Sequence, residues 1–558
     1  MKKLTKPVRK IPTHRDGLGF DTLPNMIADR AELYANNTAY INQINGKLHK
    51  LTYGQVLEKV TKLARHLQEL GYVKGDHIAV LGENRPEWGI SFFAVTWIGG
   101  VAIPLDARAS VNDHEFILRF SSAKAIILTS SYYESIQSLS PSLGDLRDII
   151  VMESINQICE KYSSGAEKGN ISKDDLLEIL FTSGTTGDPK GVMLTHGNIM
   201  SNVDDIYRII QYTPKDRAFS ILPIHHSYEC TGGLIAPLAS GMSVYYARSL
   251  KPRELLQDLK TALPTIWLNT PLLLEKLLVR INKQISSQTG IKGLVSRAIP
   301  KKLIGRKVRE NLGLNHIRLV ASGGAALPGW VSEGFHQYGI DVIQAYGLSE
   351  ASPLITVNPP SHPKHDSIGM VIPSDEVEIR DIDGEGNGEI VARGPNIMKG
   401  YYNNKSATDE TLTDDGWLLT GDIGYFDEDG YLYITGRKKF VIVTKGGKNV
   451  FPEEIEEKLT KSPFIEEALV FSPDDVDIQA LIYPNSEEIS SKLGSNTPRE
   501  EIWEFMKHEI RVINRSLESY KKVRHFAIRT DEFPKTTTRK IKRFLFKDLI
   551  LTPETKFI

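Results

Sequence analysis

The spacing of hydrophobic residues changes from one segment of the chain to the next. Residues 53–70 (YGQVLEKVTKLARHLQEL) place apolar side chains three and four positions apart, which predicts an amphipathic helix. Residues 76–82, 101–106 and 125–129 are short apolar runs without that spacing, and such runs are typical of buried strands. Because helical and strand-like segments alternate, the pattern predicts layered α/β structure with largely parallel strands.

Further strand-like runs are followed by small or polar residues. These runs lie at 218–223, 242–247, 265–271, 317–324 and 342–347. In open α/β sheets, ligands bind beyond the carboxyl ends of the strands. We therefore expect the polar segments SGG (322–324) and AYGLSE (345–350) to converge on one crevice, although they are separated in sequence.

The pattern changes again after residue 370. The segments EVEIRDIDGEGNGEIVARGP and GYFDEDGYLYITG predict short strands joined by Asp/Gly turns. Helix-like and strand-like segments resume after Gly436, which predicts a small separate domain. The expected fold class is α/β. A large N-terminal domain (1–436) of layered α/β subdomains with a small β-rich subdomain precedes a small C-terminal α+β domain (437–558).

Composition narrows the class of protein. The chain has 558 residues, which is too long for one compact core. Its 41% hydrophobic and 25% charged residues are typical of a soluble globular protein, and its net charge of −1 provides no overall attraction to nucleic acid or membrane. The two cysteines, Cys159 and Cys230, cannot form a disulfide framework or a metal cluster, which favours a reducing, cytoplasmic compartment.

Two segments bear on targeting. The basic N-terminus MKKLTKPVRK is followed by no apolar run, so we expect no signal peptide. The uncharged run 88–105 approaches the length of a membrane span, but Gly99, Gly100 and Pro104 interrupt it. We expect a buried helix followed by a strand there.

The stretch 292–309 (KGLVSRAIPKKLIGRKVR) combines basic and apolar residues. It fits a patch that contacts a membrane surface or an acidic ligand. It equally fits a solvated connecting helix, and the sequence does not separate the two. In the first case the protein would be peripheral at the inner face of a membrane.

The segment FTSGTTGDPKGV (181–192) concentrates glycines, hydroxyl side chains and one lysine. Glycine allows backbone angles that other residues avoid, and proline removes a donor, so a loop is expected. Backbone N–H groups, hydroxyls and an ammonium are groups that bind phosphate, although a surface linker has similar composition. Lys190 lies between Pro189 and Gly191, so the Walker pattern of P-loop phosphotransferases is not met.

Four other clusters accompany this loop and the polar strand ends. They are LPIHHSYE (222–229), GWLLTGDIG (416–424), GRKKFVIVTKGGKNV (436–450) and PKTTTRKIKR (534–543). In this order and spacing, the set resembles the adenylate-forming acyl-CoA synthetases over about residues 25–545. Within that superfamily, the motifs LPIHHSYE and GRKKFVIVTKGGKNV are most similar to those of fatty acyl-CoA ligases.

The resemblance implies a two-step reaction with ATP, Mg²⁺ and coenzyme A. A medium- or long-chain fatty acid would form acyl-AMP and pyrophosphate, and coenzyme A would then displace AMP. An acyl–carrier-protein ligase would share these motifs and differ only in the thiol donor. A different class, a membrane- or nucleic-acid-binding protein that uses residues 292–309, would bind without releasing pyrophosphate.

The resemblance also implies a nucleotide site. Tyr346 would stack on adenine, Asp422 would accept hydrogen bonds from the ribose hydroxyls, and Glu350 and Thr185 would hold Mg²⁺, a cation that prefers oxygen ligands. The full implied set is Thr182, Ser183, Gly184, Thr185, Thr186, Gly187, Lys190, Gly324, Ala325, Tyr346, Gly347, Ser349, Asp422, Arg437 and Lys540.

Lys540 corresponds to the lysine that bridges the acyl carboxylate and the α-phosphate in the family. The chain departs from the family pattern at Arg539, where many members have glycine, and Lys542 and Arg543 are nearby alternatives. The implied catalytic residues are Lys540, Glu350, His226 and Thr185.

Three further roles follow from the resemblance. His226 and Glu229 correspond to residues at the mouth of the acyl pocket, and a metal role is rejected because no third ligand cluster appears. Gly232 and Gly233 would leave room for the acyl chain or simply permit tight packing. Lys439 would be the hinge of a mobile C-terminal domain, and Gly446 and Gly447 would line the coenzyme A channel.

Overall fold

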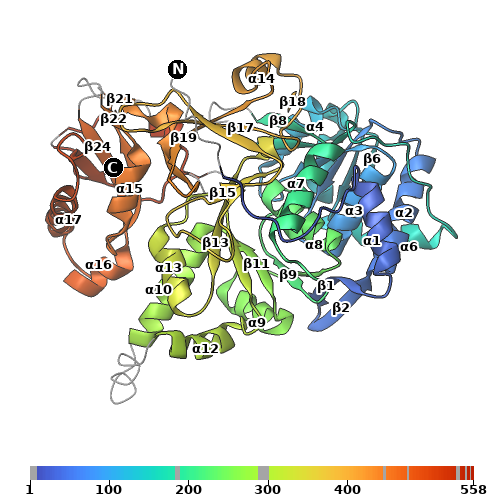
Figure 1. Ribbon diagram of the computed structural model, residues 1–558, viewed down its shortest axis with the longest axis horizontal. Coiled ribbons are helices and arrows are strands. Elements are labelled where there is room, and N and C mark those ends of the chain that lie inside the picture. Colours follow the sequence, from blue (N-terminus) through green and yellow to red (C-terminus); the bar gives the residue numbers. More distant parts are fainter. Residues whose placement is uncertain are drawn as a thin grey trace.

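Figure 1 shows the computed structural model, in which a large N-terminal part (blue to yellow) is followed by a smaller C-terminal part (orange to red). The described residues are 9–182, 189–286, 301–443, 448–473, 477–535, 541–546, 549–552 and 554–558. The expected α/β architecture with a large and a small domain is confirmed.

The first sheet has seven strands in the order β18-β8-β7-β4-β3-β5-β6. Strands β3 to β7 pair in parallel, and β7 and β8 form an antiparallel pair around the expected phosphate loop. The bounds are β3 (His77–Leu81), β4 (Val101–Leu105), β5 (Ala125–Leu128), β6 (Asp148–Val151), β7 (Leu176–Thr182), β8 (Lys190–Thr195) and β18 (Gly400–Tyr401). The three strands predicted from apolar runs at 76–82, 101–106 and 125–129 are therefore present.

The helices that accompany this sheet begin at recognisable caps. Thr52 and Gln55 form a capping box at the start of α2, and each of the two residues satisfies a backbone N–H of the other. The apolar run at 88–105 forms the buried helix α3 followed by β4, as expected. The bounds are α1 (Leu23–Leu33), α2 (Tyr53–Glu69), α3 (Pro86–Trp97), α4 (Val111–Phe120), α5 (Tyr133–Leu139) and α6 (Ile155–Glu160), with 3₁₀ turns at Ser130–Tyr132, Ser140–Ser142 and Met152–Ser154.

The second sheet has nine strands in the order β15-β14-β13-β12-β11-β9-β10-β1-β2. Its middle strands are parallel, so their carboxyl ends lie at one edge. The bounds are β1 (Thr38–Ile44), β2 (Lys47–Thr52), β9 (Arg217–Ser220), β10 (Ser243–Tyr246), β11 (Ile266–Asn269), β12 (Leu319–Ser322), β13 (Val342–Gly347), β14 (Leu354–Val357) and β15 (Met370–Val371).

A π-helix, η4 (Tyr228–Ile235), begins within the HHSYE motif and contacts β9 and β11 of the second sheet. π-Helical turns are rare and occur frequently at functional sites. The other helices of this part are α7 (His196–Ile209), α8 (Ala236–Ala239), α9 (Pro252–Ala262), α10 (Pro271–Ser286), α12 (Lys301–Leu312), α13 (Gly329–Gln337) and the 3₁₀ turn η5 (Ser349–Ala351).

The predicted β-rich segment forms a four-stranded antiparallel sheet in the order β16-β17-β19-β20. This sheet lies between the two larger sheets and the C-terminal part in Figure 1. The bounds are β16 (Glu376–Arg380), β17 (Gly388–Arg393), β19 (Leu418–Phe426) and β20 (Leu432–Arg437), with α14 (Lys405–Thr411) inserted.

The C-terminal part has buried clusters of its own, formed by residues from Ile442 onward. Its three-stranded sheet has the order β23-β24-β25. The bounds are η6 (Lys438–Phe440), β21 (Ile442–Val443), β22 (Asn449–Val450), α15 (Pro452–Thr460), β23 (Ile465–Phe471), β24 (Ile478–Pro484), α16 (Ser486–Leu493), α17 (Arg499–Asn514), β25 (Val523–Ile528) and η7 (Arg543–Phe546).

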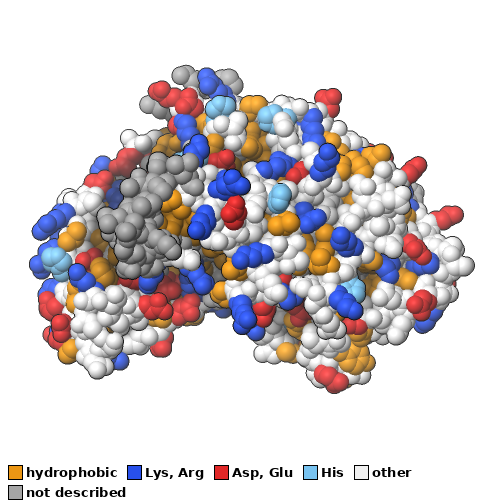
Figure 2. Space-filling view, turned by 90° about the horizontal axis from the view of Figure 1, so that it is seen from below, with side chains coloured by type: hydrophobic (Ala, Val, Ile, Leu, Met, Phe, Trp, Pro, Cys, Tyr) orange, Lys and Arg blue, Asp and Glu red, His pale blue; other side chains and the backbone are white. Residues whose placement is uncertain are grey.

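Residues 301–309 of the basic stretch lie in α12, whereas residues 292–300 are outside the described residues. Four basic residues of α12, Lys301, Lys302, Arg306 and Lys307, are exposed, and the Arg306 side chain is 85% exposed. Figure 2 shows Lys and Arg side chains spread over the face seen from below rather than gathered in one patch. In the described part of the chain, no helix is both long and apolar enough to cross a membrane.

Glu178 is an acidic residue within the first sheet's core. It lies in β7 opposite Ala102 of β4, is 1% exposed, and neither of its carboxyl oxygens has a hydrogen-bond partner among the described residues. Burial raises the pKa of Glu178 to about 8, because the charged form is poorly solvated there. The group is therefore neutral in the folded protein at neutral pH.

Replacing Glu178 with Gln is expected to reduce the loss of stability on raising the pH from about 5 to about 8. The pKa of Glu178 in the folded state lies above its ordinary value of 4.5. The folded state therefore retains the proton more tightly, and stability falls as the pH rises from the unfolded pKa through the folded pKa. Chemical denaturation at the two pH values measures this. The exposed Asp409→Asn is the control, and parallel curves for Glu178→Gln and the unaltered protein would contradict the assignment.

Candidate active site

The ends of β12 and β13 form the floor of the candidate site. The two strands pair in parallel with Ser322 opposite Gln344, so Gly324 and Tyr346 follow at the same edge of the sheet. Gly324 has φ +82°, which favours glycine, and a side chain built at this position would meet no atom within 4 Å. Gly324 and Ala325 are exposed, so this edge is open to solvent.

Asp422 lies at the centre of the site and is 3% exposed. The Tyr346 hydroxyl donates to its Oδ2 at 2.7 Å, and the Arg437 Nε contacts its Oδ1 at 2.8 Å. Asp422 and Arg437 are cross-strand partners on β19 and β20, whereas Tyr346 comes from the second sheet. The structure therefore brings together three predicted residues from two different sheets.

The charged and polar groups of this cluster shift one another's pKa values. Burial raises the pKa of the Tyr346 hydroxyl well above its ordinary value, and the charge of Asp422 adds to that effect. Burial by itself lowers the pKa of Arg437, but the charge of Asp422 outweighs it and leaves the pKa raised. The phenol is therefore a hydrogen-bond donor and the guanidinium is a fixed cation.

Glu350 belongs to a second group beside the first. The Tyr401 hydroxyl donates to Glu350 Oε1 at 2.7 Å, and the Lys190 Nζ lies 5.0 Å from the centre of the Tyr401 ring. Burial raises the pKa of Tyr401, and the charge of Glu350 adds to this. Lys190 is the cross-strand partner of Thr182, so both described ends of the expected phosphate loop lie at this group.

One carboxylate with a nearby lysine suits Mg²⁺ bound to a polyphosphate. Mg²⁺ usually takes one or two protein carboxylates and completes its shell with water and phosphate oxygens. Within the described ranges there is no group of three or more His, Cys, Asp or Glu side chains that could hold a metal without such help. Glu350 therefore fits a phosphate-bound magnesium rather than a metal held by protein alone.

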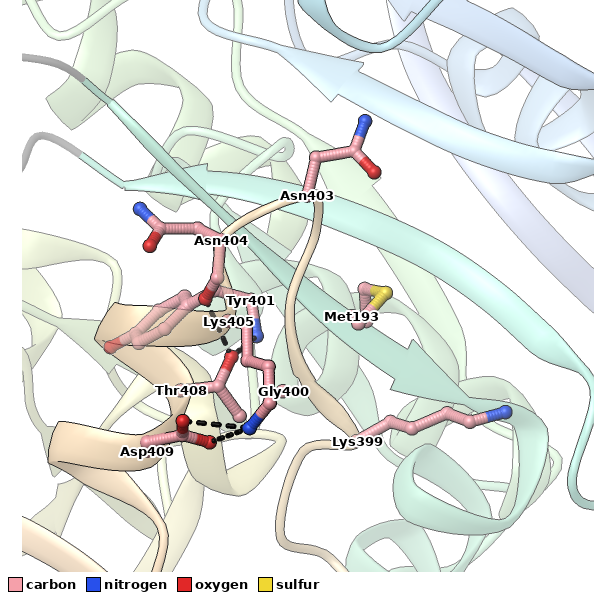
Figure 3. Close-up of a pocket in the computed structure, with 9 residues that line it drawn as sticks. All are labelled: Met193, Lys399, Gly400, Tyr401, Asn403, Asn404, Lys405, Thr408 and Asp409. Carbon is pink, nitrogen blue, oxygen red and sulfur yellow. Dashed lines mark hydrogen bonds and ion pairs between the residues drawn. The ribbon is translucent and has the colours of Figure 1, made fainter.

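A pocket of about 410 Å³ lies on the other side of Tyr401, between β8, β18 and α14. Figure 3 shows that the Lys405–Asp409 ion pair is at one end of it, with Asn403 and Asn404 at the other. Lys405 Nζ is 2.7 Å from each carboxylate oxygen of Asp409, so their charges largely neutralise each other. This pocket is separate from the group around Asp422.

His226 lies two residues before η4, and Glu229 is the second residue of η4. The Tyr228 N–H donates to His226 Nδ1 at 3.3 Å, so the Nε2 of the neutral ring carries the proton. Glu229 is 1% exposed, and burial raises its pKa to about 8. A Cβ at Gly233 would lie 2.7 Å from the Glu229 carboxyl carbon, so the space beside Gly233 is filled by Glu229.

The structure also describes the neighbours of four other predicted residues: Gly232, Gly347, Ser349 and Lys439. A Cβ at Gly232 would lie 3.3 Å from Leu268 Cδ1, and one at Gly347 would lie 1.7 Å from the Pro353 carbonyl oxygen, so Gly347 must be glycine. Ser349 Oγ is 3.4 Å from Ser227 Oγ, which connects η5 to the residue before η4. Lys439 lies in η6, directly after β20.

Several predicted residues lie outside the part of the chain that the structure describes. They are Ser183, Gly184, Thr185, Thr186, Gly187, Gly446, Gly447 and Lys540.

Two aromatic residues at the site were not predicted. Tyr401 contacts Glu350 only because β18 pairs with β8, a strand more than 200 positions earlier, and no local pattern signals this. Tyr228 lies within the LPIHHSYE motif, where its aromatic character was a usable signal. Its hydroxyl donates to the Ala321 carbonyl at 3.2 Å, and its ring lies against Gly323.

Comparisons with known proteins match nearly the whole chain. The model of the AMP-binding enzyme family matches residues 27–402, and the model of its C-terminal domain matches residues 439–549. A long-chain-fatty-acid–CoA ligase of Bacillus subtilis is 30% identical over 94% of this chain and 93% of that protein. The chloroplastic long-chain-fatty-acid–[acyl-carrier-protein] ligase AEE15 of Arabidopsis thaliana is 29% identical over 88% of this chain and 80% of that protein.

Solved structures share the fold. The anthranilate CoA ligase AuaEII in complex with anthranoyl-AMP superimposes with a TM-score of 0.79 at 23% identity, covering 94% of this chain and 96% of that one. The o-succinylbenzoate CoA synthetase MenE of Bacillus subtilis in complex with AMP gives 0.75 at 24% identity, covering 94% and 98%. Since the family model spans more than half of the sequence and the fold agrees, the chain belongs to the AMP-binding enzyme family.

Proposed function

We propose that the protein activates a medium- or long-chain fatty acid with ATP and transfers the acyl group to coenzyme A. The observation that carries the proposal is the buried Asp422 carboxylate, held by Tyr346 and Arg437 at the open end of the second sheet. Each carboxylate oxygen accepts more than one hydrogen bond, so Asp422 can accept two ribose hydroxyls while it keeps its protein partners.

The same arrangement supports a place for adenine. Tyr346 lies near the end of β13, and Gly324 follows the neighbouring strand β12 at the exposed edge, where a Cβ at Gly324 would meet no atom within 4 Å. An aromatic ring and bare backbone offer two faces between which a flat base can stack. Arg437 keeps its positive charge in this environment and offsets the negative charge of Asp422.

Adenylation requires two negatively charged groups to approach. An oxygen of the fatty acid carboxylate bonds to the α-phosphorus of ATP, and the bond from that phosphorus to pyrophosphate breaks. Magnesium supplies positive charge when bound, and Glu350 would hold it beside Lys190. Lys540 would bridge the acyl carboxylate and the α-phosphate. In the second step the thiol gives up its proton to solvent, its sulfur bonds to the acyl carbon, and AMP leaves with the electrons of the broken C–O bond.

The apolar character of η4 supports a fatty acid as substrate. The only acid in η4, Glu229, is buried and neutral at neutral pH because burial raises its pKa to about 8, so it cannot pair with a substrate amine at the surface. The names of two relatives, ligases of long-chain fatty acids, support the same class. The acyl–carrier-protein ligase remains the second candidate, because AEE15 carries that name at similar identity.

We place the protein in the cytoplasm, with peripheral contact to the membrane surface through the exposed basic side chains of α12. These are Lys301, Lys302, Arg306 and Lys307. Long-chain fatty acids partition into membranes, and basic side chains are attracted to anionic lipid. Cosedimentation with anionic vesicles is the measurement that detects such contact.

The first test is an assay of pyrophosphate release with a panel of carboxylates, with coenzyme A, a carrier protein or neither. We expect AMP and pyrophosphate as products, dependence on Mg²⁺, and the fastest release with fatty acids of about eight carbons or more, since each buried CH₂ contributes about 0.8 kcal/mol. ADP as the main product, or faster release with an amino acid, would contradict the proposal. Thioester formation only with a carrier protein would favour the second candidate.

Asp422→Asn is expected to raise the KM for ATP and weaken AMP binding by roughly 10- to 100-fold, because hydrogen bonds to a charged group contribute about 1.5–3 kcal/mol. Titration calorimetry with AMP measures binding without turnover. The matched control is Asp429→Asn, because Asp429 follows the same strand but its side chain is 64% exposed. Equal AMP affinity in both variants would remove Asp422 from the nucleotide site.

The proposed domain boundary at 437–439 is tested by two variants with opposite defects. Proline fixes φ near −65°, so Lys439→Pro should form acyl-AMP but stall before the thioester if Lys439 is the hinge. Lys540→Ala should lose acyl-AMP formation by several orders of magnitude yet convert supplied acyl-AMP to acyl-CoA. Each half-reaction is assayed separately in folded protein, and loss of the same half-reaction in both variants would show that the two roles are misassigned.

A further inference from the structure

The turn that carries Glu350 has little local support. It is the single 3₁₀ turn η5, and no side chain among the described residues caps its start. Short 3₁₀ turns have poor hydrogen-bond geometry. Ser352, which follows the turn, has φ +67°, a left-handed conformation that residues other than glycine seldom adopt. The position of the Glu350 backbone therefore depends on groups from elsewhere in the chain.

The end of this turn is hydrogen-bonded to a segment more than 40 positions later. The last carbonyl groups of a helical turn have no partner within it. Here the Glu350 carbonyl accepts the Met398 N–H at 2.9 Å. The Asn396 Nδ2 donates to the Ala351 carbonyl at 3.0 Å, and the Ser352 Oγ donates to the Asn396 carbonyl at 2.7 Å. Asn396 is thus bonded to the turn through both its side chain and its backbone.

The Asn396 side chain is buried, with 1% exposure, and its amide has further partners. Its Nδ2 also lies 2.9 Å from the Leu354 carbonyl oxygen and 2.9 Å from Asp375 Oδ2. An amide nitrogen carries two hydrogens, so three acceptors engage both of them and fix the direction in which the amide points. Asp375 is fully buried and directly precedes β16. The amide therefore joins the Glu350 turn to the start of the four-stranded sheet.

Helix α7 anchors both sides of this joint. The Asn198 Nδ2 donates to the Pro395 carbonyl at 2.7 Å and to the Ile397 carbonyl at 2.9 Å. One turn later, the Asn202 Nδ2 donates to the Leu354 carbonyl at 2.8 Å, and its Oδ1 accepts the Leu354 N–H at 3.2 Å. The residues on either side of Asn396 and the chain beyond the Glu350 turn are therefore fixed to the same helix.

The same segment also contacts the Glu350 carboxylate. Tyr401, three residues after Met398, donates to Glu350 Oε1 at 2.7 Å. The Glu350 backbone and side chain are thus both hydrogen-bonded to the stretch that begins at Asn396. Mg²⁺ demands near-ideal octahedral geometry, and groups that orient a metal ligand affect metal binding although they do not touch the metal. A shift of this turn would move the carboxylate oxygens away from the cation.

A second buried asparagine provides a comparison. Asn358 is 2% exposed, its Nδ2 donates to the Ser367 carbonyl at 2.8 Å, and its Oδ1 accepts the Lys364 N–H at 3.0 Å. These bonds close the loop that follows β14 and involve no residue of η5. Both asparagines therefore stabilise the fold, but only the Asn396 side chain is bonded to the turn that carries Glu350.

We propose that Asn396 is a positioning residue for Glu350, and that Ser352 shares this role. Its amide and carbonyl hold η5 where the Glu350 carboxylate can receive magnesium bound to the triphosphate. The inference rests on the proposed function. Because Asn396 acts through Glu350 and does not touch the nucleotide, its effect belongs to the ligand that brings the metal, ATP, and not to AMP.

The test compares Asn396→Ala with Asn358→Ala in titration calorimetry with two nucleotides, α,β-methylene ATP with Mg²⁺ and AMP without it. We expect Asn396→Ala to weaken binding of the ATP analogue by roughly 10- to 100-fold and that of AMP by less than about threefold, as for loss of a group that orients a metal ligand. The KM for Mg²⁺ in pyrophosphate release should rise by a similar factor. Asn358→Ala should leave the ratio of the two affinities unchanged.

Amide hydrogen exchange measures the turn without any nucleotide. Exchange in a peptide covering residues 348–354 should become faster in Asn396→Ala and remain unchanged in Asn358→Ala. Ser352→Ala removes one hydrogen bond of the same joint and should give a smaller change in the same direction. It replaces Asn396→Ala if that variant does not fold.

Three outcomes would overturn the proposal. They are an unchanged affinity for the ATP analogue in Asn396→Ala, an equal loss of affinity for both nucleotides, and unchanged exchange in residues 348–354. If the unaltered protein binds neither nucleotide, the proposed function is wrong, and the exchange comparison still decides whether Asn396 holds the turn.

Discussion

A buried carboxylate needs partners, and the partners of Asp422 connect the main parts of the molecule. Tyr346 donates to it from the end of β13 in the nine-stranded sheet, and Arg437 contacts it from the end of β20 in the four-stranded sheet. Removing either partner would leave an incompletely compensated charge in a poorly hydrated place, which is strongly unfavourable. This requirement holds the two sheets in one relative position at the candidate site.

From Asp422, charges of alternating sign continue into the C-terminal domain. Arg437 lies between Asp422 and the region of Glu453, and Arg543 lies between Glu453 and Glu456. Burial raises the pKa of Glu453 and Glu456, and Arg543 opposes that rise in both. Asp422, Arg437, Glu453 and Arg543 therefore interact electrostatically in sequence. A change in the charge of one of them alters the electrostatic environment of the others.

The group formed by Lys190, Tyr401 and Glu350, where we expect phosphate to bind, also depends on contacts between distant strands. β18 adds to the edge of the first sheet beside β8, and this places Tyr401 between Lys190 and Glu350. Glu350 itself comes from η5, directly after β13 of the second sheet. The two large sheets thus meet through side chains that carry charge or donate hydrogen bonds, rather than through apolar contacts alone. Such a junction can bind a charged ligand without burying an unpaired charge.

The sequence by itself determined the elements and the family. Apolar spacing gave α2 and strands β3, β4 and β5, because local periodicity follows directly from which face is buried. The motifs gave Tyr346, Asp422 and Arg437 as members of one site, through the resemblance. The sequence did not show which side chain fills the space beside a given glycine. Glu229 occupies the volume beside Gly233, and the missing side chain of a glycine says nothing about which neighbour takes its place.

Only the tertiary structure showed the contacts of Tyr401 and the ion pairs of Lys535 and Arg543. Each depends on a strand or helix distant in the chain: β8 for Tyr401, β23 for Lys535 and α15 for Arg543. A lysine or arginine in a basic segment has the same local pattern whether it is solvated or buried against a carboxylate. The choice is made by packing, because burial and the approach of the opposite charge exist only once the distant elements have come together.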